Sequence, residues 1–403
     1  NYNVHRGSGT QLSINGARTD QNLFIQDGTN TNDFFNMTPG GVTGDSLGVE
    51  AIKEFKVLTH NFSAEYGQAG GAVITTVSKS GTNEIHGNVF EFHRNSALDS
   101  RNFFDRDPVN PTVRSDVPAF KRNQFGFTLG GPIVPDRTFF FGSFEGLRER
   151  LSTTEISTFP NQDAHNGILP NVRFRGRFIC GEPRGVRGQP SQPFCDIGVV
   201  PNVQPYLDLY PLPNGGDVGD SGLGLYFWNN PRPLNEDYFL VKLDHKLTDS
   251  DDFFIRSTIS DGEFSELNES SIWRRTEENL NQYWTLEEKH IFSPNLLNEF
   301  RFAFNRSSSR TDETGPVDES MWFVDPARQK AAGFEGGMGL LFCRGCGINQ
   351  FGTSTRTPQQ HVLNTFQYID NLIWTHGDHS LKAGISYTRF QYNYRNFARL
   401  QGT

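Results

Sequence analysis

The chain has no long apolar run and few aliphatic side chains. No stretch of about 18 consecutive apolar residues occurs among its 403 residues, which excludes a membrane-spanning helix but leaves spanning strands possible. Hydrophobic residues make up only 35% of the sequence, a fraction that would also suit a disordered chain. The 36 phenylalanines argue against disorder, because large aromatic side chains favour packed, pleated surfaces.

Basic patches and catalytic motifs are also missing. The net charge is −9 at pH 7, and no basic run interleaved with aromatics occurs, so nucleic acid is not an expected partner. Neither a Gly-x-Ser-x-Gly elbow nor a His-Glu-x-x-His helix is present. Glu287 and Glu288 are adjacent on an expected strand and therefore point to opposite faces. His376 and His379 flank a tight turn. We therefore expect no enzyme, no cofactor and no metal site.

The chain contains short amphipathic runs, separated by turns that its 41 glycines and 21 prolines favour. Alternation of apolar and polar residues predicts nine strands. They lie at about 84–94, 122–130, 137–147, 237–247, 252–261, 282–292, 296–306, 363–375 and 379–392. The fold class is therefore mostly β.

The links between these strands fall into two length classes. Tight links follow the second, fourth, sixth and eighth strands, and long loops are expected at 95–121, 148–236, 262–281 and 307–362. This alternation predicts an antiparallel sheet with all its long loops at one end, which is typical of an outer-membrane barrel. A two-layer sandwich is the alternative, but it seldom carries loops of this length. An odd strand count with an open edge leads us to expect only part of a larger barrel.

The strand faces favour the barrel. Phe300, Phe302 and Phe304 share one face of the seventh strand, and Glu299 and Arg301 lie on the other. The second strand repeats the pattern with Phe125, Phe127 and Leu129. Aromatics near strand ends suit the interfacial girdles of a barrel, although ordinary sheet packing explains each one nearly as well. They are Tyr283, Trp284, Trp374 and Tyr387.

The first 80 residues differ, with denser glycine and no alternation of links. They contain NLFIQDG, in which Asp27 and Gly28 form a turn, then VEAIKEFKV at 49–57 and the Glu65-Tyr66-Gly67 triplet. GGAVITTVSKSGTN follows and ends at Asn83. Together with HGNVFEFHRN, NQFGFTLGGPI and RTFFFGSFEGLR, this run resembles a TonB-dependent outer-membrane receptor of the Oar-like subgroup. The resemblance is strong over residues 7–150 and generic beyond.

The resemblance implies two domains: a small mixed plug at residues 1–83 and the first part of a membrane barrel at 84–403. Gly67, Gly70 and Gly71 would give the plug the bare backbone and unusual dihedrals needed where it approaches the wall, with a simple turn or bulge as the alternative. The polar loop after the Asp-Gly turn would be the plug apex. Its expected substrate-binding residues are Asn30, Asn32, Asp33, Phe34 and Phe35.

Four cysteines, Cys180, Cys195, Cys343 and Cys346, fall in the expected external loops. Three pairings are possible. The spacing favours Cys180 with Cys195, and the Cys-x-x-Cys unit closing on itself. Zinc is the alternative for that unit, but an oxidising exterior favours disulfides.

The resemblance also implies the function. The expected protein sits in outer-membrane lipid, binds an unknown substrate outside and imports it when a periplasmic, TonB-type energy-coupling protein acts on the plug. The alternative is an interaction protein whose large loops serve adhesion, surface assembly or export.

Overall fold

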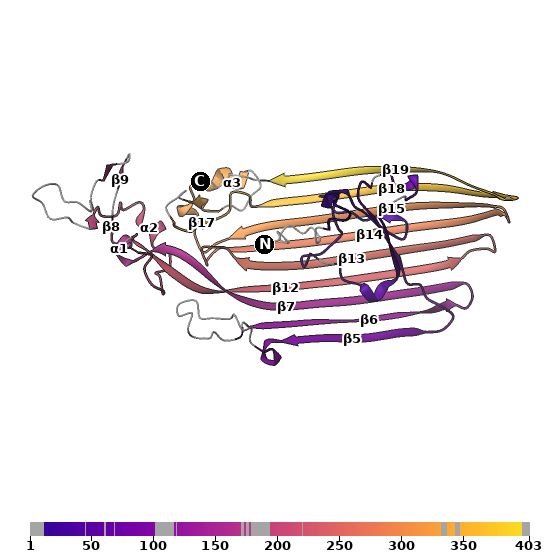
Figure 1. Cartoon of the computed structure of the whole chain (residues 1–403), viewed down its shortest axis with the longest axis horizontal. Coiled ribbons are helices and arrows are strands. Elements are labelled where there is room, and N and C mark those ends of the chain that lie inside the picture. Colours follow the sequence, from indigo (N-terminus) through magenta and orange to yellow (C-terminus); the bar gives the residue numbers. More distant parts are fainter. Residues whose placement is uncertain are drawn as a thin grey trace, which may run out of the picture.

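Two sheets of very different size make up the protein. The computed structural model describes residues 12–44, 46–59, 62–67, 69–100, 117, 119–170, 173–174, 177–178, 194–219, 221–331, 337–342 and 347–396. Nine antiparallel strands form one sheet, called the wall, in the order β19-β18-β15-β14-β13-β12-β7-β6-β5. Figure 1 shows them side by side, with tight turns at one end and the large connections at the other.

The wall strands are those predicted, but most are longer. Their bounds are β5 His86–Asn95, β6 Phe120–Val134, β7 Thr138–Pro160, β12 Leu223–Lys246, β13 Asp251–Leu267, β14 Arg274–Ser293, β15 Leu296–Thr314, β18 Gln359–His376 and β19 His379–Asn396. Every neighbouring pair in the wall is antiparallel. The mostly β, antiparallel prediction is therefore confirmed.

The extra strand length shortens the connections. The link between β13 and β14 spans only residues 268–273, and that between β7 and β12 spans 161–222, so the loops expected at 262–281 and 148–236 were drawn too long. Two of the missed segments, 148–160 of β7 and 274–281 of β14, are rich in Arg, Thr and Glu and lack a clear apolar face. Pro231 and Pro233 also read as breakers. They are tolerated because this part of β12 pairs with β7, while pairing with β13 begins only at Leu234.

The small sheet has four strands in the order β2-β1-β4-β3. Its strands are β1 Leu23–Gln26, β2 Thr29–Asn30, β3 Ile52–Leu58 and β4 Val73–Ser78. β1 runs parallel to β4, whereas β1 with β2 and β3 with β4 are antiparallel, so the sheet is mixed. Asp27 (φ +46°) and Gly28 (φ +80°) form the two-residue turn that joins β1 to β2.

The remaining elements are short. They are α1 Gln162–His165, α2 Gln204–Leu207, α3 Pro326–Ala331, β8 Ile168–Pro170, β9 Arg173–Phe174, β10 Arg177–Phe178, β11 Phe194–Asp196, β16 Leu340–Leu341 and β17 Phe351–Gly352. Five 3-10 turns lie at Thr19–Gln21, Val49–Ala51, Ala64–Tyr66, Ser96–Leu98 and Glu319–Met321. No helix among the described residues has the length and apolar character needed to cross a membrane.

The two faces of the wall are opposite in character. On the outer face, phenylalanines pack across neighbouring strands, as Phe144 does against Phe239 at 4.8 Å and Phe302 against Tyr368 at 5.1 Å between ring centres. Phe239 stays 46% exposed. Glu236 and Arg256 on the inner face are at most 1% exposed. Large apolar groups outside and charged groups inside are typical of a barrel wall in lipid.

Three of the four predicted girdle aromatics lie on this outer face. Trp284, Trp374 and Tyr387 are 40%, 43% and 58% exposed. Tyr283 was wrongly grouped with them, since it is 6% exposed and points inward. A strand places consecutive residues on opposite faces, so Tyr283 and Trp284 cannot share one environment.

Candidate functional site

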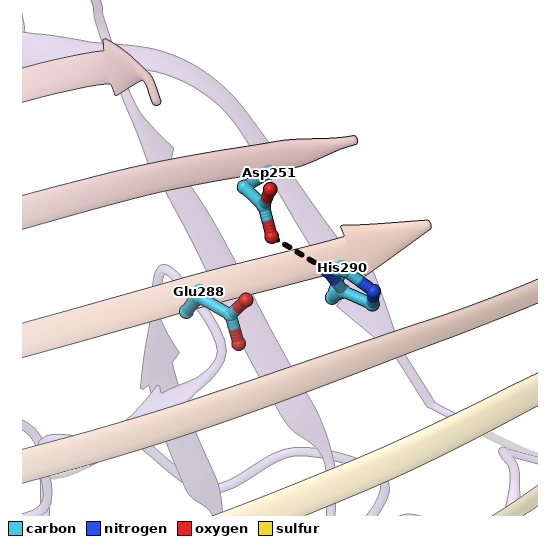
Figure 2. Close-up of side chains that lie close together, drawn as sticks. All are labelled: Asp251, Glu288 and His290. Carbon is cyan, nitrogen blue, oxygen red and sulfur yellow. Dashed lines mark hydrogen bonds and ion pairs between the residues drawn. The ribbon is translucent and has the colours of Figure 1, made fainter. Parts of the chain in front are cut away.

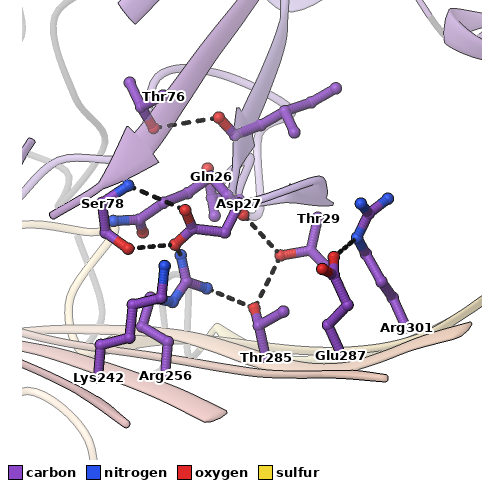
Figure 3. Close-up of polar contacts among 12 residues, drawn as sticks. Gln26, Asp27, Thr29, Thr76, Ser78, Lys242, Arg256, Thr285, Glu287 and Arg301 are labelled. Carbon is purple, nitrogen blue, oxygen red and sulfur yellow. Dashed lines mark hydrogen bonds and ion pairs between the residues drawn. The ribbon is translucent and has the colours of Figure 1, made fainter. Parts of the chain in front are cut away.

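The small sheet is attached to the inner face of the wall by a buried polar cluster, drawn in Figure 3. The turn residue Asp27 accepts hydrogen bonds from the backbone N–H and the hydroxyl of Ser78, at 2.9 and 2.7 Å. Its Oδ2 also lies 3.1 Å from Nη1 of Arg256 on β13. The two side chains are 4% and 0% exposed, so the ion pair is fully desolvated. One carboxylate therefore joins β1, β4 and the wall.

Hydroxyls extend this contact along the wall. Nη2 of Arg256 donates to the Thr285 hydroxyl at 2.6 Å, and that hydroxyl lies 3.0 Å from the hydroxyl of Thr29 (Figure 3). Thr29 in turn donates to the carbonyl of Gln26 at 3.0 Å. The hydroxyls of the cluster and both terminal nitrogens of Arg256 are thus hydrogen-bonded, which limits the desolvation penalty, while its buried Nε has no partner among the described residues.

Wall side chains also hold the backbone of the loop between β2 and β3. Glu145 accepts from the N–H of Gly48 at 2.8 Å, and Asn281 donates to the carbonyl of Gly40 at 3.0 Å. Gly48 (φ +91°) has no room for a side chain, since an added Cβ would lie 2.2 Å from the Tyr238 ring. At Gly48 the wall therefore accepts only bare backbone, whereas Val42 and Leu47 of the same loop pack their side chains against it.

The glycines that permit this approach are not the three expected ones. An added Cβ at Gly71 would meet Asn22 Oδ1 at 2.6 Å, within the small sheet, and Gly67 and Gly70 have no close wall neighbour. None of the three has a positive φ, so the expected unusual dihedrals do not occur. The glycines that contact the wall, Gly41 and Gly48, lie earlier in the chain, in the loop between β2 and β3. Nearby, Glu65 is tied to the wall by an ion pair of 2.6 Å with Lys382, and Tyr66 packs on Phe62.

The five expected substrate-binding residues mainly make contacts within the protein. Asn30 bonds to Gln367 of β18 through both its N–H and its carbonyl, at 3.0 and 2.9 Å. Asn32 accepts from the N–H of Phe24 at 2.8 Å. Phe34 stacks on His361 of β18 at 4.6 Å, and Phe35 lies 5.3 Å from the same ring. The two rings face the wall and are only partly exposed. Their role in substrate binding stays a prediction.

Asp33 is the unusual member of this loop. Its Oδ1 accepts from the N–H groups of Phe35 and Met37, both at 2.8 Å, while its buried Oδ2 has no partner among the described residues. Burial raises the pKa of this carboxyl to about 6, against the lowering effect of the two backbone hydrogen bonds.

A large cavity lies on the side of this loop that faces the long connections. Its volume is about 900 Å³, and its lining includes Trp228, Glu266, Glu313 and Tyr394 from the wall together with residues of the link between β15 and β18. This cavity, called the vestibule, is within the size range of ligand pockets.

The external connections pack on one another above the vestibule. Trp273, Met338 and Phe351 are fully buried, and Tyr210 stacks on Phe351 at 3.8 Å between ring centres. Cys195 is buried and disulfide-bonded. Cys180, Cys343 and Cys346 lie outside the described residues, so the expected pairings are not tested.

Among the described residues, one trio of possible metal ligands occurs, Asp251, Glu288 and His290 (Figure 2). Asp251 and His290 face each other on β13 and β14, with Nδ1 2.5 Å from the carboxylate. The trio lies on the outer face beside the tight turns, away from the vestibule. The hydrogen bond between His290 and Asp251 accounts for the arrangement. Glu288 and Glu287 point to opposite faces, as expected: Glu287 is buried on the inner face.

Comparison with known proteins places this geometry in a family. Residues 77–403 match the model of the outer membrane beta barrel domain. The TonB-dependent transporter Oar of Myxococcus xanthus is 32% identical over 164 residues, 40% of this chain and 15% of that protein. A probable TonB-dependent siderophore receptor, PirA of Acinetobacter baumannii, is 30% identical over 139 residues, 32% of this chain and 16% of that protein.

Solved structures agree on the fold. The outer membrane transporter YddB of Escherichia coli has a TM-score of 0.54 and 11% sequence identity, covering 95% of this chain and 42% of that chain. The chain thus spans under half the length of this neighbour, and its matched segments span about one sixth of the curated relatives. All three are transporters or receptors rather than enzymes. The chain belongs to the outer-membrane β-barrel family and is an outer-membrane homologue of the TonB-dependent transporter Oar.

Proposed function

We propose that the chain forms the plug, residues 1–83, and the first wall strands, residues 84–403, of an outer-membrane receptor that imports a bound substrate. The observation that carries this proposal is the buried contact between Asp27 and Arg256. It attaches a small mixed sheet to the inner face of a lipid-facing wall, beneath a large cavity. A receptor that is closed at rest needs such an attachment.

The attachment is polar around Asp27, beside an apolar part in which Val42 and Leu47 pack against the wall, and the polar part suits a gate that has to open. Buried polar contacts give specific positions, and they cost less to break when water can enter and replace them. We propose that a TonB-type periplasmic protein supplies the force that disrupts this contact. The named relatives support that partner, because both are described as TonB-dependent.

An engineered disulfide tests the gate. The hydroxyls of Thr29 and Thr285 lie 3.0 Å apart across the interface, so cysteines at both positions are close enough to bridge. In the full-length protein, Thr29→Cys with Thr285→Cys should prevent uptake when oxidised and restore it when reduced. The substrate for this assay is found by comparing growth of a deletion strain and its parent on single carbon and iron sources.

Each single cysteine variant serves as the control and should import at the normal rate under both conditions. A protonophore should stop uptake by the wild type, as expected for energy from the inner membrane. Normal uptake by the oxidised double variant would show that the plug does not have to leave this wall.

An interaction function is the second candidate, and the packed external connections favour it. Loops that only frame an entrance need no core, yet here Trp273, Met338 and Phe351 build one. A deletion strain with normal uptake but altered surface adhesion or protein export would select this candidate instead.

A further inference from the structure

We propose that the vestibule binds a neutral, hydroxyl-rich ligand, namely an oligosaccharide. This inference rests on the proposed receptor function and names its class of substrate. It follows from four properties of the cavity: a cover on one side, the charge of the lining, its hydrogen-bonding groups and an aromatic ring.

The vestibule is covered on one side and open to solvent on another. The link between β15 and β18 crosses its outer side, where Glu313 accepts from the N–H of Ser354 at 2.6 Å and from the hydroxyl of Thr357 at 3.2 Å. Asn268, in the link between β13 and β14, donates to the carbonyl of Gly352 at 3.0 Å. A ligand held under this cover loses part of its water and needs the polar groups that face the lining to be satisfied by it.

The charge of the lining is unsuited to an anionic ligand. Four glutamates and two arginines line the cavity. Glu266 is paired with Arg232 at 2.8 Å, and Glu313 is occupied by its three donors, Asn268, Ser354 and Thr357. Arg275 is in turn paired with Glu277. With no basic excess, the cavity gives an anionic iron chelate no electrostatic attraction. Because glutamates outnumber arginines, the lining repels an anion, and the choice of a neutral ligand over a cation rests on the hydrogen-bonding groups and the aromatic ring.

Neutral hydrogen-bonding groups dominate instead. Ten lining side chains are Ser, Thr, Asn or Gln. Among the residues that the structure describes, the side chains of Gln350, Thr355 and Gln359 make no hydrogen bond. Amides and hydroxyls both donate and accept, which matches sugar hydroxyls that do the same.

An aromatic ring completes the site. Tyr394 of β19 lines the vestibule and is backed by the His361 ring at 4.5 Å. A ring held in this way presents an apolar face with a polar tip, to which the C–H face of a sugar can stack. Trp228 also lines the cavity, with its indole N–H fixed on the hydroxyl of Ser157 at 3.1 Å.

A binding experiment tests the inference without requiring transport. The purified full-length receptor in detergent is applied to an array of neutral and acidic glycans, with ferric enterobactin and trilysine as the anionic and cationic probes. We expect binding to neutral glycans only. Calorimetry with the strongest neutral glycan should show at least a tenfold weaker affinity for Tyr394→Ala and for Gln359→Ala.

Glu263→Gln is the matched control, because Glu263 is exposed on the outer face of β13 and should leave affinity unchanged. Binding of ferric enterobactin or trilysine alone, or of no glycan, overturns the inference. If Tyr394→Ala and Gln359→Ala are folded and bind the glycan as tightly as the wild type, the inference is also overturned. If the protein takes up another solute but binds no glycan, only the substrate class is refuted. If it binds a glycan but shows no energised uptake, only the receptor-transporter function is refuted.

Discussion

The carboxylate of Asp27 lies 3.1 Å from the guanidinium of Arg256, and neither group reaches solvent. The two residues are 229 positions apart in sequence and belong to different sheets. Their contact holds the small sheet in place and makes a direct prediction about stability.

Asp27→Ala should destabilise the full-length protein by about 3–5 kcal/mol, because it leaves Arg256 charged and buried with the Thr285 hydroxyl but without its carboxylate partner. Denaturant unfolding in lipid vesicles measures the loss. Asp27→Ala combined with Arg256→Met should recover part of it, since no charge then remains buried.

The matched control for this pair is Glu65 with Lys382, which also joins the small sheet to the wall but is 39% and 46% exposed. Glu65→Gln should cost no more than about 1 kcal/mol. Equal losses for Asp27→Ala and Glu65→Gln would contradict a special role for the buried pair.

Gly48→Ala should displace the loop between β2 and β3 from the wall. The new methyl group would lie 2.2 Å from the Tyr238 ring, at a residue with φ +91°. Left-handed strain and overpacking together should cost at least about 2 kcal/mol. Increased entry of a large antibiotic through the outer membrane is the cellular measurement.

Gly16→Ala separates the two causes, because Gly16 has φ +74° but no atom within 4 Å of an added Cβ. It should show only the strain, about 1–2 kcal/mol. If Gly16→Ala and Gly48→Ala lose the same amount of stability, then the close approach to Tyr238 contributes nothing to the loss.

Asp33→Asn should remove a pH dependence of stability. The pKa of Asp33 is raised to about 6 by burial, so the protonated form is favoured in the folded protein. The stability this gives is fully present below the ordinary pKa near 3.8 and is lost as pH rises through 6. The variant keeps an acceptor for Phe35 and Met37 and carries no charge.

Thermal melting of the wild type and of Asp33→Asn, measured between pH 4 and pH 7.5, compares their stabilities. The wild type should lose up to about 3 kcal/mol relative to Asp33→Asn over this range. Parallel curves for the two proteins would show that Asp33 does not titrate near 6 in the fold.

Phe239→Arg should impair folding into a membrane. Phe239 is 46% exposed on the outer face and packs on Phe144. A charge at the lipid face costs about 2–4 kcal/mol near the bilayer midplane. Refolding yield into vesicles measures the effect, and an exposed phenylalanine facing water would instead tolerate the change.

The sequence predicted the wall well because each strand carries its own alternation. Phe300, Phe302 and Phe304 fall on one face whatever else the chain does, since successive side chains point to opposite sides of a strand. Strand ends were predicted poorly. Segments such as 148–160 have no apolar face, and only pairing with β12 makes them strands.

The candidate site was predicted less completely from the sequence than the wall. The Asp-Gly turn at Asp27 was readable locally, because two adjacent residues at positive φ suit that dipeptide. Its partner Arg256 carried no signal, since an arginine alternating with apolar residues reads as an ordinary inner-face residue. Gly41 and Gly48 were likewise missed, because their neighbours Glu236 and Tyr238 come from a distant strand.

Local spacing and composition thus determined the type of structure: amphipathic strands with one apolar and one polar face, joined by turns. Which charges meet, which glycines touch a neighbour and which residues enclose the vestibule were decided only by tertiary structure. The physical reason is that contacts across the interface depend on register between segments hundreds of residues apart, and no local pattern encodes that register.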